Sequence, residues 1–372
     1  AIAGFLPILF STNAVSPESL ALPLMLFTIY AFLRLPEPRY LMMYFIAFLM
    51  AAFTSSSLAL LLLGFAIYVI FHKVERKKLP RAQAEVIIAS IFFYLWSQFL
   101  FFKQTLLQEG PAFLWKNIPS SLLASLLPSP SISEALISIS IIPLVVGLYM
   151  VYKTLFQAPN SRALLLVSFV ISTIAFTLLR VIPFPLALAF IGLLLAVFFS
   201  WFYQSMDKYF QQTKLSAWQP VLFLVVGSLL LLTTTYPAIA TALEQDLPTA
   251  ADIQAYRWLS DHTSEPSGVA AVMKEGHLIT FLGQRKNLLD DQFRLQEDAE
   301  ERYAASKAIF TTKFETEAIS LLNRYGLRYV VVTPDAKELL GIPRLSYLSP
   351  QCFRLVYHDN VKIYEAICRL EK

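Results

Sequence analysis

Charged residues are scarce in this chain of 372 residues, and their scarcity excludes an ordinary soluble protein. Asp, Glu, Lys and Arg make up 15% of the residues, whereas soluble domains carry about a quarter. Hydrophobic residues make up 56% and aromatic residues 14%, and the mean hydropathy is +0.58. We therefore expect a mainly α polytopic membrane protein.

Cysteine is nearly absent as well, since only Cys352 and Cys368 occur. Two cysteines exclude a multi-cysteine metal cluster and a disulfide-dense scaffold. The sequence also lacks the motifs GxxxxGKS/T, GxSxG, HExxH and CxxC, and its four histidines are scattered. Acid–base chemistry would therefore rest on carboxylates, and recognition of a polyanionic substrate would rest on arginine.

Charge divides the chain into two parts. Residues 1–236 carry 14 Lys and Arg against 7 acidic residues, while residues 237–372 carry 16 against 19. A basic transmembrane helical domain, 1–236, thus precedes a slightly acidic domain, 237–372, in which the hydrophobic runs are shorter. Nothing in this distribution indicates nucleic-acid binding.

Apolar runs close to the ~20 residues that cross a bilayer recur throughout the first part. They predict about eight or nine transmembrane helices, at 1–10 (a partial span), 17–33, 40–54, 57–72, 84–102, 134–152, 162–179, 184–203 and 218–236.

The charges between these runs predict an orientation. Strict alternation of the spans places eleven Lys and Arg on one side and only Lys103, Lys116 and Arg180 on the other. Because basic residues accumulate on cytoplasmic loops, the richer side is cytoplasmic in a multi-pass protein of the plasma membrane. The segments outside are then 11–16, 103–133, 180–183 and 237–372.

The second part reads as an extracytoplasmic α/β domain. Segment 252–259 forms an amphipathic helix with Thr249 as its N-cap. The other expected elements are buried strands at 268–273 and 327–333, helices at about 297–310 and 314–325, and a closing hairpin of 353–357 and 361–367. Cys352 and Cys368 fall nearly opposite in that hairpin, where they form either a disulfide or two separate thiols.

Arg180 lies between two long apolar runs at the expected outer face. A cation costs about 2.5–3.5 kcal/mol at the bilayer centre and much less near the headgroups. It therefore either anchors the head of a hydrophobic helix or meets an anion.

Glu18 lies where the outer segment 11–16 enters a membrane helix. Ser16 suits the N-cap, Pro17 the first helical position and Glu18 the first turn, where a carboxylate faces the positive end of the helix. That structural role is sufficient to explain a glutamate at this position. The functional alternative makes Glu18 a ligand for a hard divalent cation, Mg²⁺ or Mn²⁺.

The outer loop 103–133 is long and rich in apolar residues and prolines. It is either an aromatic-anchored turn in the membrane interface or a mobile loop that closes over a lipid-borne substrate. Its candidate substrate-binding residues are Lys103, Trp115 and Lys116. His277 is a further candidate, and the competing interpretation is an exposed loop residue without such a role.

The layout of many membrane helices followed by one outer α/β domain resembles the GT-C superfamily of integral-membrane glycosyltransferases. These enzymes take a sugar from a polyprenyl-phosphate carrier on the outer face. Segment 11–21, STNAVSPESLA, is similar to the SxxxGSxDNExxA-like loop of oligosaccharyltransferase catalytic subunits, whose acidic residues help to bind the metal; here the Gly and the paired Asp are missing. Arg180, ahead of Pro183 and Pro185, resembles the arginine that faces the carrier phosphate.

Three stretches of the second part are similar to outer domains of archaeal-type GT-C proteins: AYRWL at 255–259, YGLRYVVV at 325–332 and FRLVYHDNVKIY at 353–364. The acceptor-recognition motif WWDYG is absent. The resemblance implies a membrane glycosyltransferase with a polyprenyl-phosphate-linked donor and Arg180 as the ligand of the carrier phosphate. The alternative is a non-catalytic scaffold subunit that keeps the fold. Carboxylates at the outer face distinguish the two, because an enzyme needs them and a scaffold does not.

The resemblance also implies a catalytic Asp that this chain lacks. GT-C enzymes carry that Asp in the first outer loop, whereas the outer carboxylates of the membrane part here are Glu18, Glu109 and Glu134. The chain starts inside an apolar run, without an initiator Met or a basic signal-peptide region. We therefore expect either an N-terminal part, on the same polypeptide or a partner chain, that supplies the Asp, or an inactive relative.

Overall fold

The computed structural model describes residues 17–35, 37–110, 131–157, 160–213, 218–243, 248–290, 293 and 298–369. Contacts divide the chain into a helical unit and a second, mixed unit. The helices of the first unit are α1 (Pro17–Leu33), α2 (Pro38–Thr54), the 3-10 turn η3 (Ser56–Leu58), α3 (Ala59–Val74), α4 (Arg81–Glu109), α7 (Ile132–Ile139), α8 (Ile141–Phe156), α9 (Ser161–Leu178), α10 (Phe184–Gln211) and α11 (Gln219–Leu243).

Among the described residues, five helices are long and apolar enough to cross a membrane. A sixth span is obtained if α7 and α8, which meet at an angle of 103°, are counted as one broken span. Helices α1 and α2 are also apolar but have only 17 residues each. The helices coincide with the predicted runs from 17–33 onward. The run 1–10 lies outside the described residues, and the count of eight or nine spans stays a prediction.

Two helices extend beyond their predicted ends. The loop predicted to begin at residue 103 is helical up to Glu109, because α4 bends at Phe102 and ends only before Gly110, which has a positive φ of 62°. Helix α11 continues through Pro237 to Leu243. Its Thr-rich stretch does not break it, since Thr234 donates its hydroxyl to the carbonyl oxygen of Leu230 at 2.7 Å.

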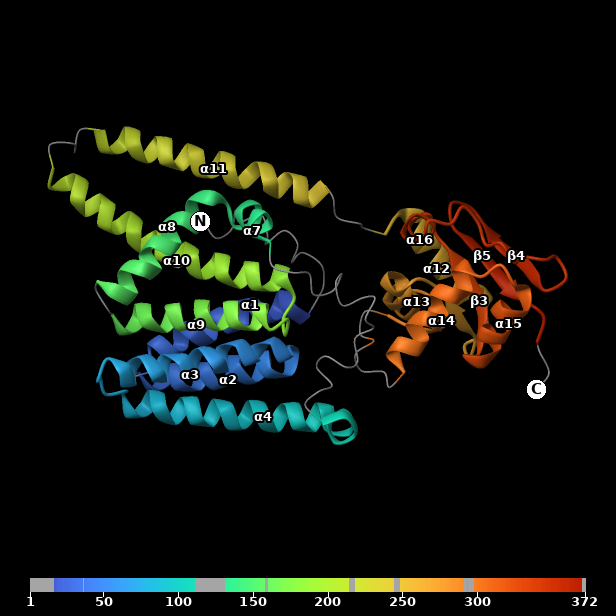
Figure 1. Ribbon diagram of the computed structural model, residues 1–372, viewed down its shortest axis with the longest axis horizontal. Helices are drawn as coiled ribbons and strands as arrows, with labels where there is room; N and C mark the ends of the chain where they lie inside the picture. The colour runs from blue at the N-terminus through green and yellow to red at the C-terminus, as the bar shows by residue number, and fades with distance from the viewer. Residues whose placement is uncertain are drawn as a thin grey trace. The chain divides into compact units, whose positions relative to one another are not determined.

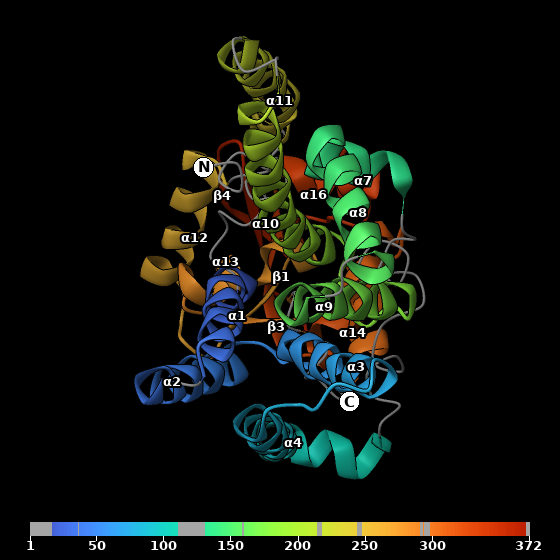
Figure 2. The ribbon, with the colours of Figure 1, turned by 90° about the vertical axis from the view of Figure 1, so that its left-hand side faces the viewer.

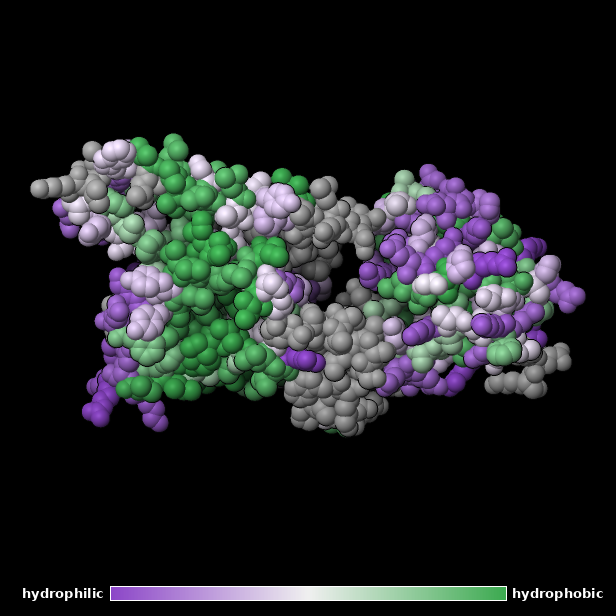
Figure 3. All heavy atoms as spheres, turned by 45° about the horizontal axis from the view of Figure 1, so that its top comes forward, coloured by the Kyte–Doolittle hydropathy of each residue, from purple (hydrophilic) through white to green (hydrophobic). Residues whose placement is uncertain are grey.

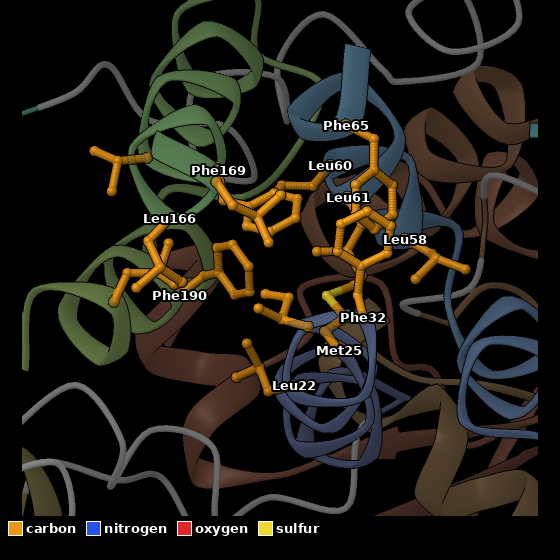
Figure 4. Packing of buried hydrophobic residues seen from close by; sticks show 14 of the residues in the cluster. Leu22, Met25, Phe32, Leu58, Leu60, Leu61, Phe65, Leu166, Phe169 and Phe190 are labelled. Carbon is orange, nitrogen blue, oxygen red and sulfur yellow. The ribbon is translucent and has the colours of Figure 1, made fainter. Parts of the chain in front are cut away.

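The core of the helical unit takes residues from most of its helices, among them α1, α2, α3, α9 and α10. Figure 4 shows Leu22 and Met25 of α1, Phe65 of α3, Phe169 of α9 and Phe190 of α10 pointing into one cluster. Figure 3 shows apolar residues covering much of the visible outer face of this unit. A bundle that is apolar both inside and outside suits a lipid environment.

Apart from α7 and α8, consecutive helices run in opposite directions, so their ends gather at two sides of the unit (Figure 1). Figure 1 shows that α9 ends, α10 begins and α11 ends on one side, where α1, α3 and α7 also begin. The loops 34–37 and 75–80 lie on the opposite side. We call these sides the Arg180 end and the basic end.

The second unit is a five-stranded sheet with helices on both faces. Its elements are α12 (Ala250–His262), β1 (Gly268–Ala270), the 3-10 turn η6 (Met273–Glu275), α13 (Gly276–Phe281), β2 (Lys286–Asn287), α14 (Ala299–Thr311), α15 (Glu315–Arg324), β3 (Leu327–Val332), α16 (Pro334–Leu340), β4 (Phe353–His358) and β5 (Lys362–Ala366). The strand order is β2-β1-β3-β5-β4. Strands β2, β1 and β3 are parallel, and β5 pairs antiparallel with β3 and β4.

Strand β3 is buried on both faces except at Arg328, and its buried positions are apolar or aromatic. Val330 and Val332 belong to one core cluster with Ile309, while Tyr329 and Val331 belong to the cluster on the other face. The predicted α/β character and the expected strands, helices and hairpin of this part are confirmed. The short elements β2, α13 and α16 were not predicted.

Helix α12 starts as predicted, since Thr249 and Asp252 form a reciprocal capping box. A disulfide joins Cys352 and Cys368 at the base of the β4–β5 hairpin, with a Cα–Cα distance of 4.8 Å. The alternative of two separate thiols is therefore not realised.

Candidate functional site

Arg180 occupies the position that ends α9, and its backbone is left-handed, with φ of 53°. The Arg180 N–H donates to the carbonyl oxygen of Thr177 at 3.0 Å, and the Val181 N–H donates to that of Phe176 at 2.9 Å. These two bonds are the Schellman pattern, in which glycine is the usual residue at this position. An arginine here costs on the order of 1 kcal/mol relative to glycine.

The Arg180 side chain is exposed, and no carboxylate among the described residues pairs with it. Its neighbours Leu178 and Leu179 are 68% and 60% exposed. The sequence had suggested that Arg180 lies at the head of α10. In the structure it terminates α9 instead. The negative end of the α9 dipole stabilises a cation there, which supports the anchoring role, and the absence of an acidic partner leaves its charge available to an anion.

Three further candidates belong to helix segments at the Arg180 end: the starts of α1 and α7 and the last part of α4. Glu18 is half-buried in the first turn of α1, and Glu134 lies in the first turn of α7, where its N–H donates to the Ser131 hydroxyl at 3.4 Å. Lys103 is exposed on α4, just beyond the bend. The Arg180 end thus offers exposed cations and single carboxylates at the starts of helices.

A metal site does not form from the described residues, which contain no group of three or more His, Cys, Asp or Glu able to hold an ion. Glu18 fills the predicted first-turn position, and Ser16, its expected N-cap, lies outside the described residues. A single carboxylate does not fit Mg²⁺ or Mn²⁺, which need several oxygen ligands. The divalent cation stays a prediction, and no chemical step is derived through it.

The remaining candidates are not brought together by the structure. Trp115 and Lys116 lie outside the described residues, as does the predicted loop over 111–130. His277 is exposed in the second unit, but it belongs to the short helix α13, not to a loop. Only glycine fits at Gly276, where this helix begins, because a Cβ there would lie 2.2 Å from the Leu289 carbonyl oxygen.

Sequence reasoning missed a buried carboxyl group, Glu275, which follows β1 at the carboxyl edge of the parallel strands. Burial raises the pKa of Glu275 to about 7; hydrogen bonds with Thr333 and Tyr256 lower it, and repulsion from Asp252 and Asp335 adds to the rise. Its side chain is 7% exposed. The available signal was a glutamate shortly after the predicted buried strand 268–273. Because it is enclosed, we assign it to the pH dependence of the fold and not to substrate binding.

Comparison with known proteins gives remote similarities. No family model and no curated protein matches the chain. The archaeal oligosaccharyltransferase AglB from Archaeoglobus fulgidus, solved with an inhibitory peptide and a dolichol-phosphate, aligns at 16% identity and a TM-score of 0.43 over 78% of this chain and 38% of that one. An apo oligosaccharyltransferase from the same organism aligns at 14% identity and a TM-score of 0.41, over 86% of this chain and 46% of that one.

The isolated C-terminal globular domain of an A. fulgidus oligosaccharyltransferase aligns at 15% identity and a TM-score of 0.24, over 33% of this chain and 99% of that domain. The present chain thus spans less than half of the whole oligosaccharyltransferases that it matches. TM-scores below 0.5 do not establish a shared fold. The structure itself defines a class: a bundle of apolar helices of membrane-spanning length, followed by a separate α/β unit.

Proposed function

We propose that this chain is a membrane glycosyltransferase of the GT-C type, or part of one. It uses a polyprenyl-phosphate-linked sugar donor at the outer membrane face, and Arg180 holds the carrier phosphate. Membrane lipid and the lipid-linked sugar are its partners. The proposal rests on the chemistry and placement of Arg180, because the structural similarities are too remote to carry it.

The observation that carries the proposal is the left-handed backbone of an exposed, unpaired arginine. Glycine would be more stable at this position, so the fold alone does not account for Arg180. Since the side chain has no carboxylate among the described residues, its fork of N–H donors is available to a phosphate. The phosphate gains negative charge as the glycosidic bond breaks, and a fixed guanidinium stabilises that charge.

Two observations support an outer location for this end. The basic residues gather at the opposite end of the bundle, and α11 ends at the Arg180 end before the chain enters the second unit. The second unit contains the Cys352–Cys368 disulfide, which suits an oxidising compartment. On this proposal the α/β unit is extracytoplasmic.

One observation favours the rival, a non-catalytic scaffold subunit. Glu18 and Glu134 are separate carboxylates on different helices, and no Asp lies in the described part of the Arg180 end. Sugar transfer requires a carboxylate that takes a proton from the acceptor or orients it. We therefore propose that an N-terminal part or a partner chain supplies the missing Asp.

The test compares binding of a polyprenyl phosphate with binding of the uncharged polyprenol of the same length. The purified 372-residue chain should prefer the phosphate. Arg180→Lys should lose about tenfold or more of that preference, because an ammonium keeps the charge but not the two-point contact. The control is Arg39→Lys, since Arg39 is exposed but already paired with Glu37 at 2.6 Å. Equal preference in wild type and Arg180→Lys would remove the phosphate role.

A further inference from the structure

A second group of cations lies at the basic end, and the proposed function does not use it. The loop 75–80 joins α3 to α4, and both helices are long and apolar enough to cross a membrane. So short a loop between two spans lies at the level of the lipid headgroups. Figure 2 views the helical unit from this end and shows α3 beside α9.

The cations of this loop fall into two groups. Lys77 is paired with Glu75 at 2.6 Å, and Arg81 is paired with Glu85 at 3.0 Å. Three others, Lys73, Arg76 and Lys78, are exposed and form no ion pair with any carboxylate in the part of the chain that the structure describes.

Hydrogen bonds order the backbone at the start of the loop. The Arg76 N–H donates to the Lys73 carbonyl oxygen at 3.2 Å, and the Lys77 N–H donates to that of His72 at 2.9 Å. Arg76 itself is left-handed, with φ of 54°. These bonds order the backbone at Arg76 and Lys77, so less backbone freedom is lost there when a ligand binds.

Packing of α3 against α9 adds a fourth cation. The Ser172 hydroxyl of α9 donates to the Leu60 carbonyl oxygen of α3 at 2.7 Å, and the Phe65 and Phe169 rings lie 5.3 Å apart. In this antiparallel register, the start of α9 lies beside the end of α3. Arg162 is therefore at the basic end.

Helix stability does not explain Arg162. It is exposed and lies in the first turn of α9, where the positive end of the helix dipole disfavours a cation. No ion pair with a carboxylate offsets this in the described chain. An anion from outside the chain would offset this cost.

We propose that Lys73, Arg76, Lys78 and Arg162, which we call the basic patch, bind the headgroups of anionic phospholipids in the leaflet opposite Arg180. The headgroup level of the loop supplies the phosphates, and the charge of the patch is complementary to them. Val74, next to Lys73, is 73% exposed and gives the patch an aliphatic flank against lipid. The proposal does not depend on the proposed function.

The test measures how many phosphatidylglycerol and phosphatidylcholine molecules the full chain retains in native mass spectrometry after mixing with equal amounts of both. Wild type retains phosphatidylglycerol preferentially. Each cation of the basic patch contributes about fivefold to this preference. The double variant Arg76→Gln/Arg162→Gln therefore loses roughly 25-fold, and each of its single variants loses about fivefold.

The matched control is Lys77→Gln/Arg81→Gln, which removes the same amount of charge from paired cations. It should change the preference clearly less than Arg76→Gln/Arg162→Gln does, because Lys77 and Arg81 already contact Glu75 and Glu85. Equal losses in the two double variants would mean that overall charge attracts the lipid, and this would overturn the basic patch. Absence of any preference in wild type would overturn it as well.

Discussion

Arg76 and Arg180 hold the same left-handed backbone conformation at opposite ends of the helix bundle. Their φ angles are 54° and 53°, and each completes the same pair of hydrogen bonds at the end of its helix. Glycine is favoured at both positions. Two exposed arginines therefore occupy sites where helix termination alone would select another residue, and we propose a phosphate ligand for each.

Gly64 is expected to be intolerant of any side chain. A Cβ at Gly64 would lie 2.0 Å from the Phe169 ring carbon Cδ1, so α3 and α9 would have to separate. Gly64→Ala should lower the free energy of unfolding by about 1–3 kcal/mol. Thermal unfolding of the purified protein in detergent measures this loss.

The control for that substitution is Gly227→Ala in α11, where a Cβ would meet no atom within 4 Å. It should leave the melting temperature unchanged or raise it, because alanine is the better helix former. A Gly64→Ala protein as stable as Gly227→Ala would show that the two helices do not pack this closely.

Stability of the second unit should fall as pH rises from about 4.5 to about 7. Burial raises the pKa of Glu275 to about 7 from its ordinary 4.5, so the folded state keeps a proton that the unfolded chain releases. The stabilisation is complete below pH 4.5 and is lost above pH 7, and it amounts to on the order of 3 kcal/mol.

Hydrogen exchange of residues 268–281, corrected for the intrinsic effect of pH, measures this change. Glu275→Gln carries no titrating proton and should show little loss of protection between pH 4.5 and 7. The same loss in wild type and Glu275→Gln would contradict the assignment.

Reduction of the Cys352–Cys368 disulfide should destabilise the second unit. The bond spans a sequence separation of 16, for which loss of the cross-link costs about 3 kcal/mol. The expected results are a lower melting temperature in dithiothreitol and maleimide labelling only after reduction. Two reactive thiols in the native, unreduced protein would contradict the bond.

The orientation is tested with single cysteines introduced at Ser264 and at Pro80, both exposed. An impermeant maleimide added to intact cells should label the Ser264 site only, because the eleven-to-three distribution of Lys and Arg places the loop near Pro80 inside. Labelling at Pro80 alone would invert the orientation and place Arg180 at the cytoplasmic face.

Much of the fold was predictable because its signals are local. Long apolar runs located the membrane helices, and the run Leu327–Val332 was recognisable as a strand buried on both faces. Helix ends were less predictable. Lys103 and Pro237 looked like boundaries, yet both lie inside helices whose backbone hydrogen bonds outweigh one charge or one proline.

The candidate site was predictable in composition but not in conformation. An arginine between apolar runs drew attention to residue 180, but no local pattern revealed that its backbone is left-handed. Glu275 was missed because its burial depends on Thr333, a residue distant in sequence. Arg162 joins the basic patch only through the register of α3 on α9, which packing around Gly64 determines.

The most direct test of the central claim is the change in melting temperature on adding a polyprenyl phosphate, relative to the uncharged polyprenol, for wild type, Arg180→Gly and Arg76→Gly. The nanodiscs contain phosphatidylcholine and no anionic phospholipid, so that loss of a basic-patch residue does not change the melting temperature through lipid binding. Without ligand, both glycine variants should melt above wild type, because glycine relieves the left-handed backbone.

Wild type and Arg76→Gly should gain stability from the phosphate, whereas Arg180→Gly, although more stable without ligand, should gain none. That outcome would show that Arg180 destabilises the free protein and binds the phosphate. A phosphate-dependent rise in Arg180→Gly equal to that of wild type would contradict the account.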